Sequence, residues 1–146
     1  MIKELMLGDW VKPFGSNEGV YAKITSITPN RIDIVTTNGN PHHATADYIK
    51  PIPLTPEILE KNGFHINGIK EKMPTIIDDW SDDTYVWSRQ ETPDEKMMVS
   101  VYMDDINNFF VEIICQYCHV DGIHIRYVHE LQHTLKLCGI KKTIKL

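Results

Sequence analysis

The sequence predicts a mainly β protein with an α+β second half. In this fold an N-terminal SH3-like small β-barrel is followed by a short helix, and then by an antiparallel three- to four-stranded sheet packed by one C-terminal helix. Two observations support the prediction. Short β-branched and aromatic runs alternate with Gly, Pro and Asn breaks through residues 7–54, and longer strand-like runs in the second half precede one stretch with helical periodicity.

The composition is that of a globular protein. The 146 residues are 42% hydrophobic and 24% charged, which suits one domain or two small ones. The net charge of -5 and the lack of a Lys/Arg cluster disfavour nucleic-acid binding. Neither an apolar signal region nor a run of roughly 18 apolar residues is present, so we expect no membrane association. Three cysteines, an odd and small number, argue against a disulfide framework and favour a reducing, cytoplasmic setting.

The N-terminal part contains four or five short strand-like runs. They lie at residues 7–11, 19–29, 31–39 and 46–54. So few strands cannot form two full sheets, and closing them into a small barrel would remove the exposed edges. We therefore assign residues 1–54 to an SH3-like β-barrel module.

A short helix is predicted within residues 54–64. Thr55 suits the N-cap, Pro56 suits the first helical position, and Gly63 can adopt the left-handed conformation that ends a helix. An irregular, polar stretch follows, so residues 55–83 are predicted to be a helix and a connecting loop.

The second module is predicted to span residues 84–146. Strand-like runs at 84–88, 97–103 and 109–119 form a β-meander, with residues 104–108 as a hairpin turn.

A helix over about residues 125–138 is expected to pack on this meander. Gly139 can end the helix, and residues 141–146 are a candidate last edge strand. The apolar residues of the predicted helix recur at helical spacing, and they are Val128, Leu131, Leu135 and Cys138.

This helix carries the pattern HExxH, at His129, Glu130 and His133. Histidines four residues apart lie on one helix face and can bind zinc, with the glutamate as general base. A catalytic zinc needs a third protein ligand, and the residues after His133 contain no Asp, Glu or His. Upstream candidates stand at no diagnostic spacing: His42, His43, His65, His119 and His124. We therefore favour a structural helix and keep a zinc hydrolase as an alternative.

A second zinc alternative combines these histidines with Cys115 and Cys118. The resulting pattern, C-x2-C-x10-H-x3-H, is shorter than a finger with about twelve central residues. In a strand the two cysteines would also point to opposite faces. We favour ordinary strand positions for them and keep a structural zinc site without catalysis as an alternative.

Candidate binding residues lie near the first long loop of the predicted barrel, at residues 12–19. Loops at this position of small barrels often contact ligands, and Phe14 and Glu18 are candidates there. Trp10 is a third candidate, although its strand-like surroundings favour a packing role.

Two other features are interpreted as structural. The acidic run at residues 78–83 lacks the ligand order of a calcium-binding loop, so we expect a solvated loop. Trp80 lies within this run, and Trp87 lies in a strand-like run where packing is the favoured role.

Three segments resemble a group of short proteins encoded in Bacteroidetes genomes and in their phages and mobile elements. They are "LMLGDWV", "YIKPIPLTPEILEKNGF" and "IRYVHELQHTLKLCGI", which lie at both ends and in the middle of the chain. No activity is assigned to that group. The resemblance therefore implies a cytoplasmic bacterial or phage accessory protein and transfers no functional residues.

The function predicted from the sequence is a non-catalytic protein-binding or adaptor role in a bacterial or phage system. A protein partner is expected, with no cofactor, no nucleic acid and no membrane. The zinc alternatives would use His129 and His133 as ligands, and the hydrolase would use Glu130 as base.

Overall fold

The structure, a computed structural model, shows two compact units. It describes residues 5–66, 84–90, 96–103, 108–115 and 119–146. Each unit contains a five-stranded antiparallel sheet. The predicted mostly β protein with antiparallel sheets and α-helices is thus confirmed. One unit comprises Met1–Pro53, Tyr127–Ile144 and Leu146, and the other comprises Leu54–Arg126 and Lys145.

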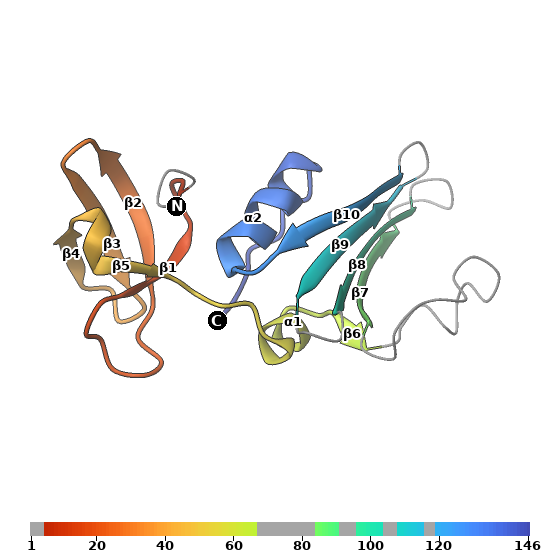
Figure 1. Ribbon diagram of the computed structural model, residues 1–146, viewed down its shortest axis with the longest axis horizontal. Coiled ribbons are helices and arrows are strands. Elements are labelled where there is room, and N and C mark those ends of the chain that lie inside the picture. The colour runs from red at the N-terminus through yellow and green to blue at the C-terminus, as the bar shows by residue number, and fades with distance from the viewer. Residues whose placement is uncertain (1–4, 67–83, 91–95, 104–107, 116–118) are drawn as a thin grey trace. The chain divides into compact units, whose positions relative to one another are not determined.

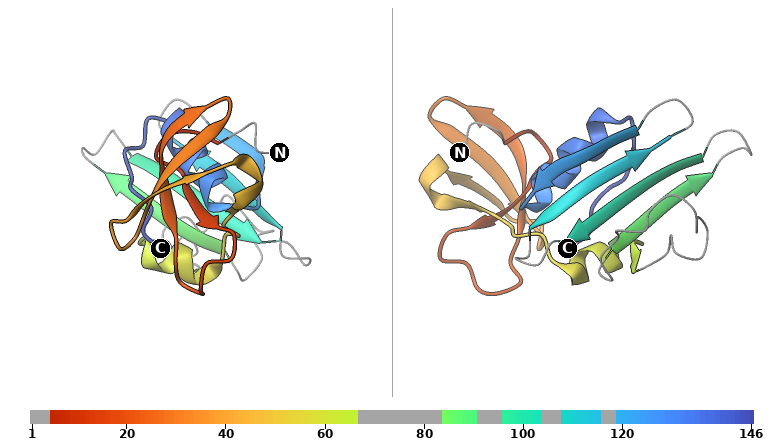
Figure 2. Two further views of the ribbon diagram at one scale, coloured as in Figure 1. Left: turned by 90° about the vertical axis from the view of Figure 1, so that its left-hand side faces the viewer. Right: turned by 45° about the vertical axis from the view of Figure 1, so that its right-hand side comes forward.

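The sheet of the first unit has the strand order β4-β3-β2-β1-β5. A one-turn 3-10 helix, Ala46–Tyr48, precedes β5 and returns the chain to β1 (Figure 1). Figure 2 shows the twist of this sheet, whose strands run from red to yellow. Its ladder is open among the described strands, because β4 and β5 each pair with one neighbour. The strands are β1 (Trp10–Pro13), β2 (Ala22–Thr28), β3 (Arg31–Thr36), β4 (Pro41–Ala44) and β5 (Ile49–Pro51).

Alternating apolar side chains form the core of this sheet. In β3 every second residue is buried, which is the period expected of a strand with one face toward the core. The buried cluster draws on four of the five strands, and its members are Val11, Ala22, Ile24, Ile32, Ile34 and Ile49.

Strand β4 was not predicted. Its sequence, PHHA, has no apolar alternation, and its residues are mostly exposed. It joins the sheet through backbone pairing with β3, for example His42 opposite Ile34. An edge strand of this kind leaves almost no side-chain signal in the sequence.

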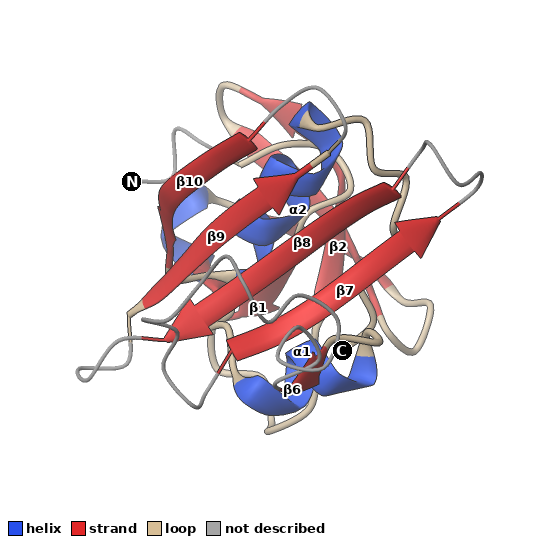
Figure 3. Cartoon of the chain, turned by 90° about the vertical axis from the view of Figure 1, so that its right-hand side faces the viewer, coloured by secondary structure: helices blue, strands red, loops and turns tan. Residues whose placement is uncertain are grey.

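The sheet of the second unit has the strand order β10-β9-β8-β7-β6 (Figure 3). The sequence predicted three to four strands, and the described residues of this unit form five. The predicted strand at 109–119 is replaced by the antiparallel pair β9 and β10, and the two-residue β6 was not foreseen. The strands are β6 (His65–Ile66), β7 (Thr84–Gln90), β8 (Lys96–Met103), β9 (Phe109–Ile114) and β10 (His119–Ile125).

Helix α1 (Pro56–Lys61) begins and ends as predicted. The Thr55 hydroxyl accepts a hydrogen bond from the Ile58 N–H at 3.4 Å, and Pro56 occupies the first helical position. Gly63 follows the helix with φ of 81°, a left-handed conformation that favours glycine. The helix contacts β6 and β7, and its Leu59 is fully buried.

Helix α2 (Val128–Leu137) is grouped with the first sheet. Its N-cap residue Tyr127 forms a β-bridge with Pro53, and the Val128 N–H donates to the Ile52 carbonyl at 2.9 Å. The division of the chain therefore differs from the predicted module 84–146, which joined this helix to the second set of strands.

The C-terminal segment 141–146 forms no strand, contrary to the expectation of an edge strand. Ile144 is fully buried instead, and its carbonyl accepts a hydrogen bond from the Trp10 indole N–H at 2.8 Å. Burial of the Ile144 side chain and the hydrogen bond from Trp10 therefore hold this segment in place without a β-ladder.

Some predicted features lie outside the described residues. They are the acidic run 78–83 with Trp80, most of the turn at 104–108, and Cys118. Within the described part of the chain, no helix has the length and apolar character needed to span a membrane.

Substitution of Asn62 tests the packing of the second unit. This buried amide donates to the carbonyls of Ile58 and Lys145, both at 2.7 Å, and accepts from the Lys145 N–H at 2.7 Å. We expect Asn62→Ala to lower the free energy of unfolding by about 2–4 kcal/mol, because it leaves buried backbone groups without partners. Urea denaturation measures the change.

The matched control is Asn17→Ala, at an exposed asparagine. Its effect should stay within about 0.5 kcal/mol. Equal effects of the two substitutions would contradict the anchoring role of Asn62.

Candidate functional site

The two histidines of the HExxH pattern are neighbours on α2, as their spacing predicted. The ring centroids of His129 and His133 are 5.6 Å apart and their planes meet at 70°. His129 is buried and stacks on the Tyr127 ring at 5.7 Å. The pattern therefore lies partly within the protein and does not form a solvated helix face.

Glu130 caps the start of α2. Its Oε2 atom accepts a hydrogen bond from the Tyr127 backbone N–H at 3.0 Å, which is the glutamate half of a capping box. Tyr127 is not among the residue types that favour a helix N-cap, and the Glu130 contact supplies a cap in its place. A structural use thus accounts for the glutamate of the pattern.

His133 pairs with a buried carboxylate. Its Nε2 atom lies 2.9 Å from both carboxylate oxygens of Asp9, a residue that is only 3% exposed. Asp9 also accepts a hydrogen bond from the Met6 N–H at 2.7 Å. The imidazole therefore gives a hydrogen-bonding partner to a carboxyl group that would be costly to bury alone.

Gln132 and Trp10 extend this contact between α2 and β1. The Gln132 Oε1 atom accepts from the Trp10 backbone N–H at 3.1 Å, and its Nε2 atom donates to the Gly8 carbonyl at 3.3 Å. The Lys23 amine lies over the Trp10 ring, 4.7 Å from the ring centroid, and the Trp10 indole N–H donates a hydrogen bond to the Ile144 carbonyl. The candidate binding residue Trp10 thus has packing and hydrogen-bond contacts within the first unit.

No third zinc ligand joins His129 and His133 among the described residues. There, a single group of three His, Cys, Asp or Glu side chains brings its donor atoms within 4.8 Å of one another, and it excludes both helix histidines. That group is Glu112, His119 and Asp121. His119 is the one upstream candidate that belongs to a three-ligand group within the described part of the chain.

The cysteines also differ from the expectation. Cys115 takes part in a disulfide bond, whereas the odd cysteine count had favoured reduced thiols. A single pair is compatible with an odd count. A disulfide sulfur is not a thiolate ligand, so this state does not fit the C-x2-C zinc alternative. Cys138 is free, and burial raises the pKa of its thiol.

The first unit carries an open hollow of about 690 Å³ beside the loop that follows β1. Phe14 and Tyr48 line it, and each is 59% exposed, with ring centroids 6.3 Å apart and planes at 81°. The apolar part of the lining is completed by Pro13, Val20, Ile34 and Ala44. Two large aromatic rings thus remain accessible next to an apolar surface.

The rest of this aromatic hollow is basic or neutral. Arg31, His42 and His43 line it, and none of the described residues in the lining is Asp or Glu. Asp33, outside the lining, pairs with Arg31 at 2.9 Å and with His43 at 2.7 Å. The Lys50 amine lies 4.9 Å from the Phe14 ring centroid. The Lys50 cation therefore lies beside the Phe14 ring, and the Arg31 cation lines the hollow while it is paired with Asp33.

The sequence identified one of the two aromatic rings. Phe14 lines the hollow, whereas Glu18 is exposed on the same loop outside the lining, and Trp10 lies elsewhere. Tyr48 and the residues of β4 were missed. Tyr48 lies in a one-turn helix that has no buried residues. A large aromatic residue in a short polar segment of this kind is the sequence feature that could have indicated an exposed ring.

Comparisons of the chain with protein-family models, curated proteins and solved structures find no match.

Substitutions of Glu130 separate a cap from a catalytic base. We expect Glu130→Ala to lower the free energy of unfolding by about 1 kcal/mol, because the Tyr127 N–H loses its acceptor. Glu130→Gln keeps an oxygen acceptor and should cost less than about half as much. Thermal and urea unfolding measure both, and equal losses would contradict the capping role.

Proposed function

We propose that the chain is a non-catalytic protein-binding or adaptor protein. Its first unit binds an extended segment of a partner protein in the aromatic hollow. The observation that carries this proposal is the exposed pair Phe14 and Tyr48, set edge to face beside an apolar lining. Clustered exposed aromatic rings mark interaction sites, because covering them removes apolar surface from water.

The charges near the hollow suggest the chemistry of the ligand. Arg31, His42 and His43 supply donors at the lining, and Lys50 stands beside Phe14. An apolar side chain in the ligand would pack on the two rings, and a carboxylate would pair with the cations. We therefore propose a segment that combines apolar and acidic residues.

An SH3-like barrel is the architecture we propose for the first unit. The meander β1 to β4, with β5 returning to pair with β1 after a 3-10 turn, supports it. The bacterial or phage origin and the cytoplasmic location are likewise proposals. The disulfide of Cys115 speaks against the cytoplasmic location, because disulfides persist mainly in oxidising compartments.

The zinc-hydrolase alternative has less support. Its proposed base, Glu130, caps a helix, and one of its ligands, His133, pairs with Asp9. Both groups have structural roles that account for their presence.

Peptide selection tests the proposed binding site. A random-peptide library is selected against the immobilised chain, and the affinities of recovered peptides are measured by fluorescence anisotropy. We expect Phe14→Ala and Tyr48→Ala each to weaken binding about 10-fold or more, as for aromatic anchors at interfaces. Both side chains are exposed, so stability should change by less than about 0.5 kcal/mol.

The control is Ile27→Ala. Ile27 is an exposed apolar residue of the same sheet outside the hollow, and its loss should leave affinity unchanged. Selection that yields no binding peptides, or affinities that are insensitive to Phe14 and Tyr48, would contradict the proposal.

A further inference from the structure

A polar row crosses three strands of the second sheet. Ser100 of β8 lies directly opposite Glu112 of β9. On the other side of Glu112, the register with β10 shifts by one residue, so that Asp121 and Gly122 together oppose it. Directly opposed residues share one face of a sheet, so these polar side chains lie on the same face.

The register shift places Asp121 in this row. Gly122 has a φ of 75°, the conformation typical of a bulge that contains glycine, and its N–H donates to the Asp121 Oδ1 atom at 2.6 Å. The Tyr102 hydroxyl donates to the same oxygen at 3.1 Å. Bulges can redirect a side chain, and here the Asp121 carboxylate is held beside its neighbours by two donors.

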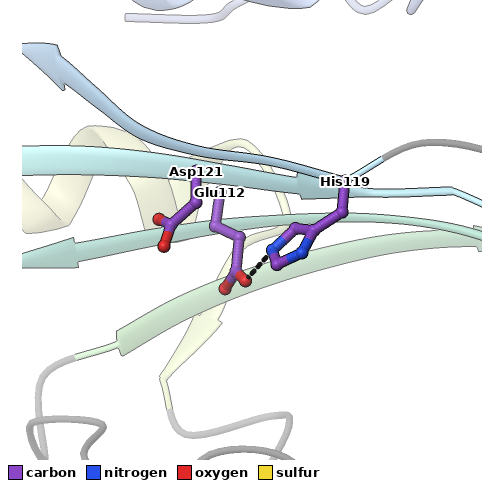
Figure 4. Close-up of side chains that lie close together, drawn as sticks. All are labelled: Glu112, His119 and Asp121. Carbon is purple, nitrogen blue, oxygen red and sulfur yellow. Dashed lines mark hydrogen bonds and ion pairs between the residues drawn. The ribbon is translucent and has the colours of Figure 1, made fainter.

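His119 completes the group from the same strand. Its Nε2 atom lies 2.5 Å from the Glu112 Oε1 atom, and the donor atoms of Glu112, His119 and Asp121 all lie within 4.8 Å of one another (Figure 4). In a tetrahedral zinc site, metal–ligand distances of about 2.0–2.2 Å place two ligand atoms about 3.3–3.6 Å apart. The three donor atoms lie within 4.8 Å, so side-chain rotations that draw them closer would be needed to place all three on one ion.

The charge balance of this group favours a cation. Glu112 is only 6% exposed, and a second carboxylate, Asp121, lies beside it. Protonated His119 would compensate only one of the two negative charges. A divalent ion with a neutral imidazole would compensate both, which matters most for the buried one.

Ser100 provides an independent observation. It is 0% exposed, and its hydroxyl has no hydrogen-bond partner among the described residues. Buried hydroxyls are normally bonded, so an isolated one requires an explanation. Its position opposite Glu112 would allow it to bond a ligating carboxylate or a water on the ion.

We propose that Glu112, His119 and Asp121 form a binding site for a divalent transition-metal ion, with Zn²⁺ as the reference ion. One imidazole and two carboxylates suit zinc or a similar ion better than Mg²⁺, which prefers oxygen ligands only. Three protein ligands leave a coordination position open. The site is separate from the HExxH pattern and does not depend on the aromatic hollow.

Isothermal titration of the untagged full chain with Zn²⁺ tests this site. We expect one ion per chain, bound more tightly than Mg²⁺. His119→Gln and Asp121→Asn should each weaken Zn²⁺ binding by at least about 10-fold. Both residues are exposed, so these variants should remain folded, which circular dichroism checks.

The matched control is His65→Gln. His65 is also an exposed histidine of the same unit, but it belongs to no three-ligand group among the described residues. Its loss should leave the affinity unchanged. The proposal would be overturned by undetectable Zn²⁺ binding, by equal losses in the control, or by binding that needs His133 and tolerates His119→Gln.

Discussion

The buried Asp9 carboxylate is the constraint around which the first unit is organised. A charge with 3% exposure requires a partner, and His133 supplies it with both carboxylate oxygens at 2.9 Å. Because His133 belongs to α2 and Asp9 immediately precedes β1, this ion pair holds together segments 124 residues apart in the chain. The Gln132 contacts with Gly8 and Trp10 reinforce the same junction.

This constraint changes the interpretation of the HExxH pattern. His133, the second histidine of the pattern, contacts the Asp9 carboxylate. Glu130 accepts a hydrogen bond at the start of the helix, and His129 stacks on the Tyr127 ring. Each chemical group that suggested catalysis thus has a structural role. Other candidate groups lie in the exposed rings of Phe14 and Tyr48 and in the cluster of Glu112, His119 and Asp121 in the second sheet.

Local signals in the sequence were sufficient for much of the fold. The cap at Thr55, the stop at Gly63 and the alternation in β3 are properties of a few neighbouring residues, and they are present in the structure. The order of strands, the pairing of β4 and the grouping of α2 depend on distant contacts. The candidate sites also depend on distant contacts. The pairing of β1 with β5 brings Tyr48 beside Phe14, and the pairing of β9 with β10 brings Asp121 beside Glu112.

Native-state amide hydrogen exchange of the wild type and of Asp9→Asn tests the central claim most directly. If the Asp9–His133 pair joins α2 to β1, the substitution should lower the opening free energies of the Val11 and Leu131 amides together, by about 1 kcal/mol or more. The Val111 amide of the second sheet should change less. A decrease at Val11 with no change at Leu131 would contradict the account, because α2 would then be held by other contacts.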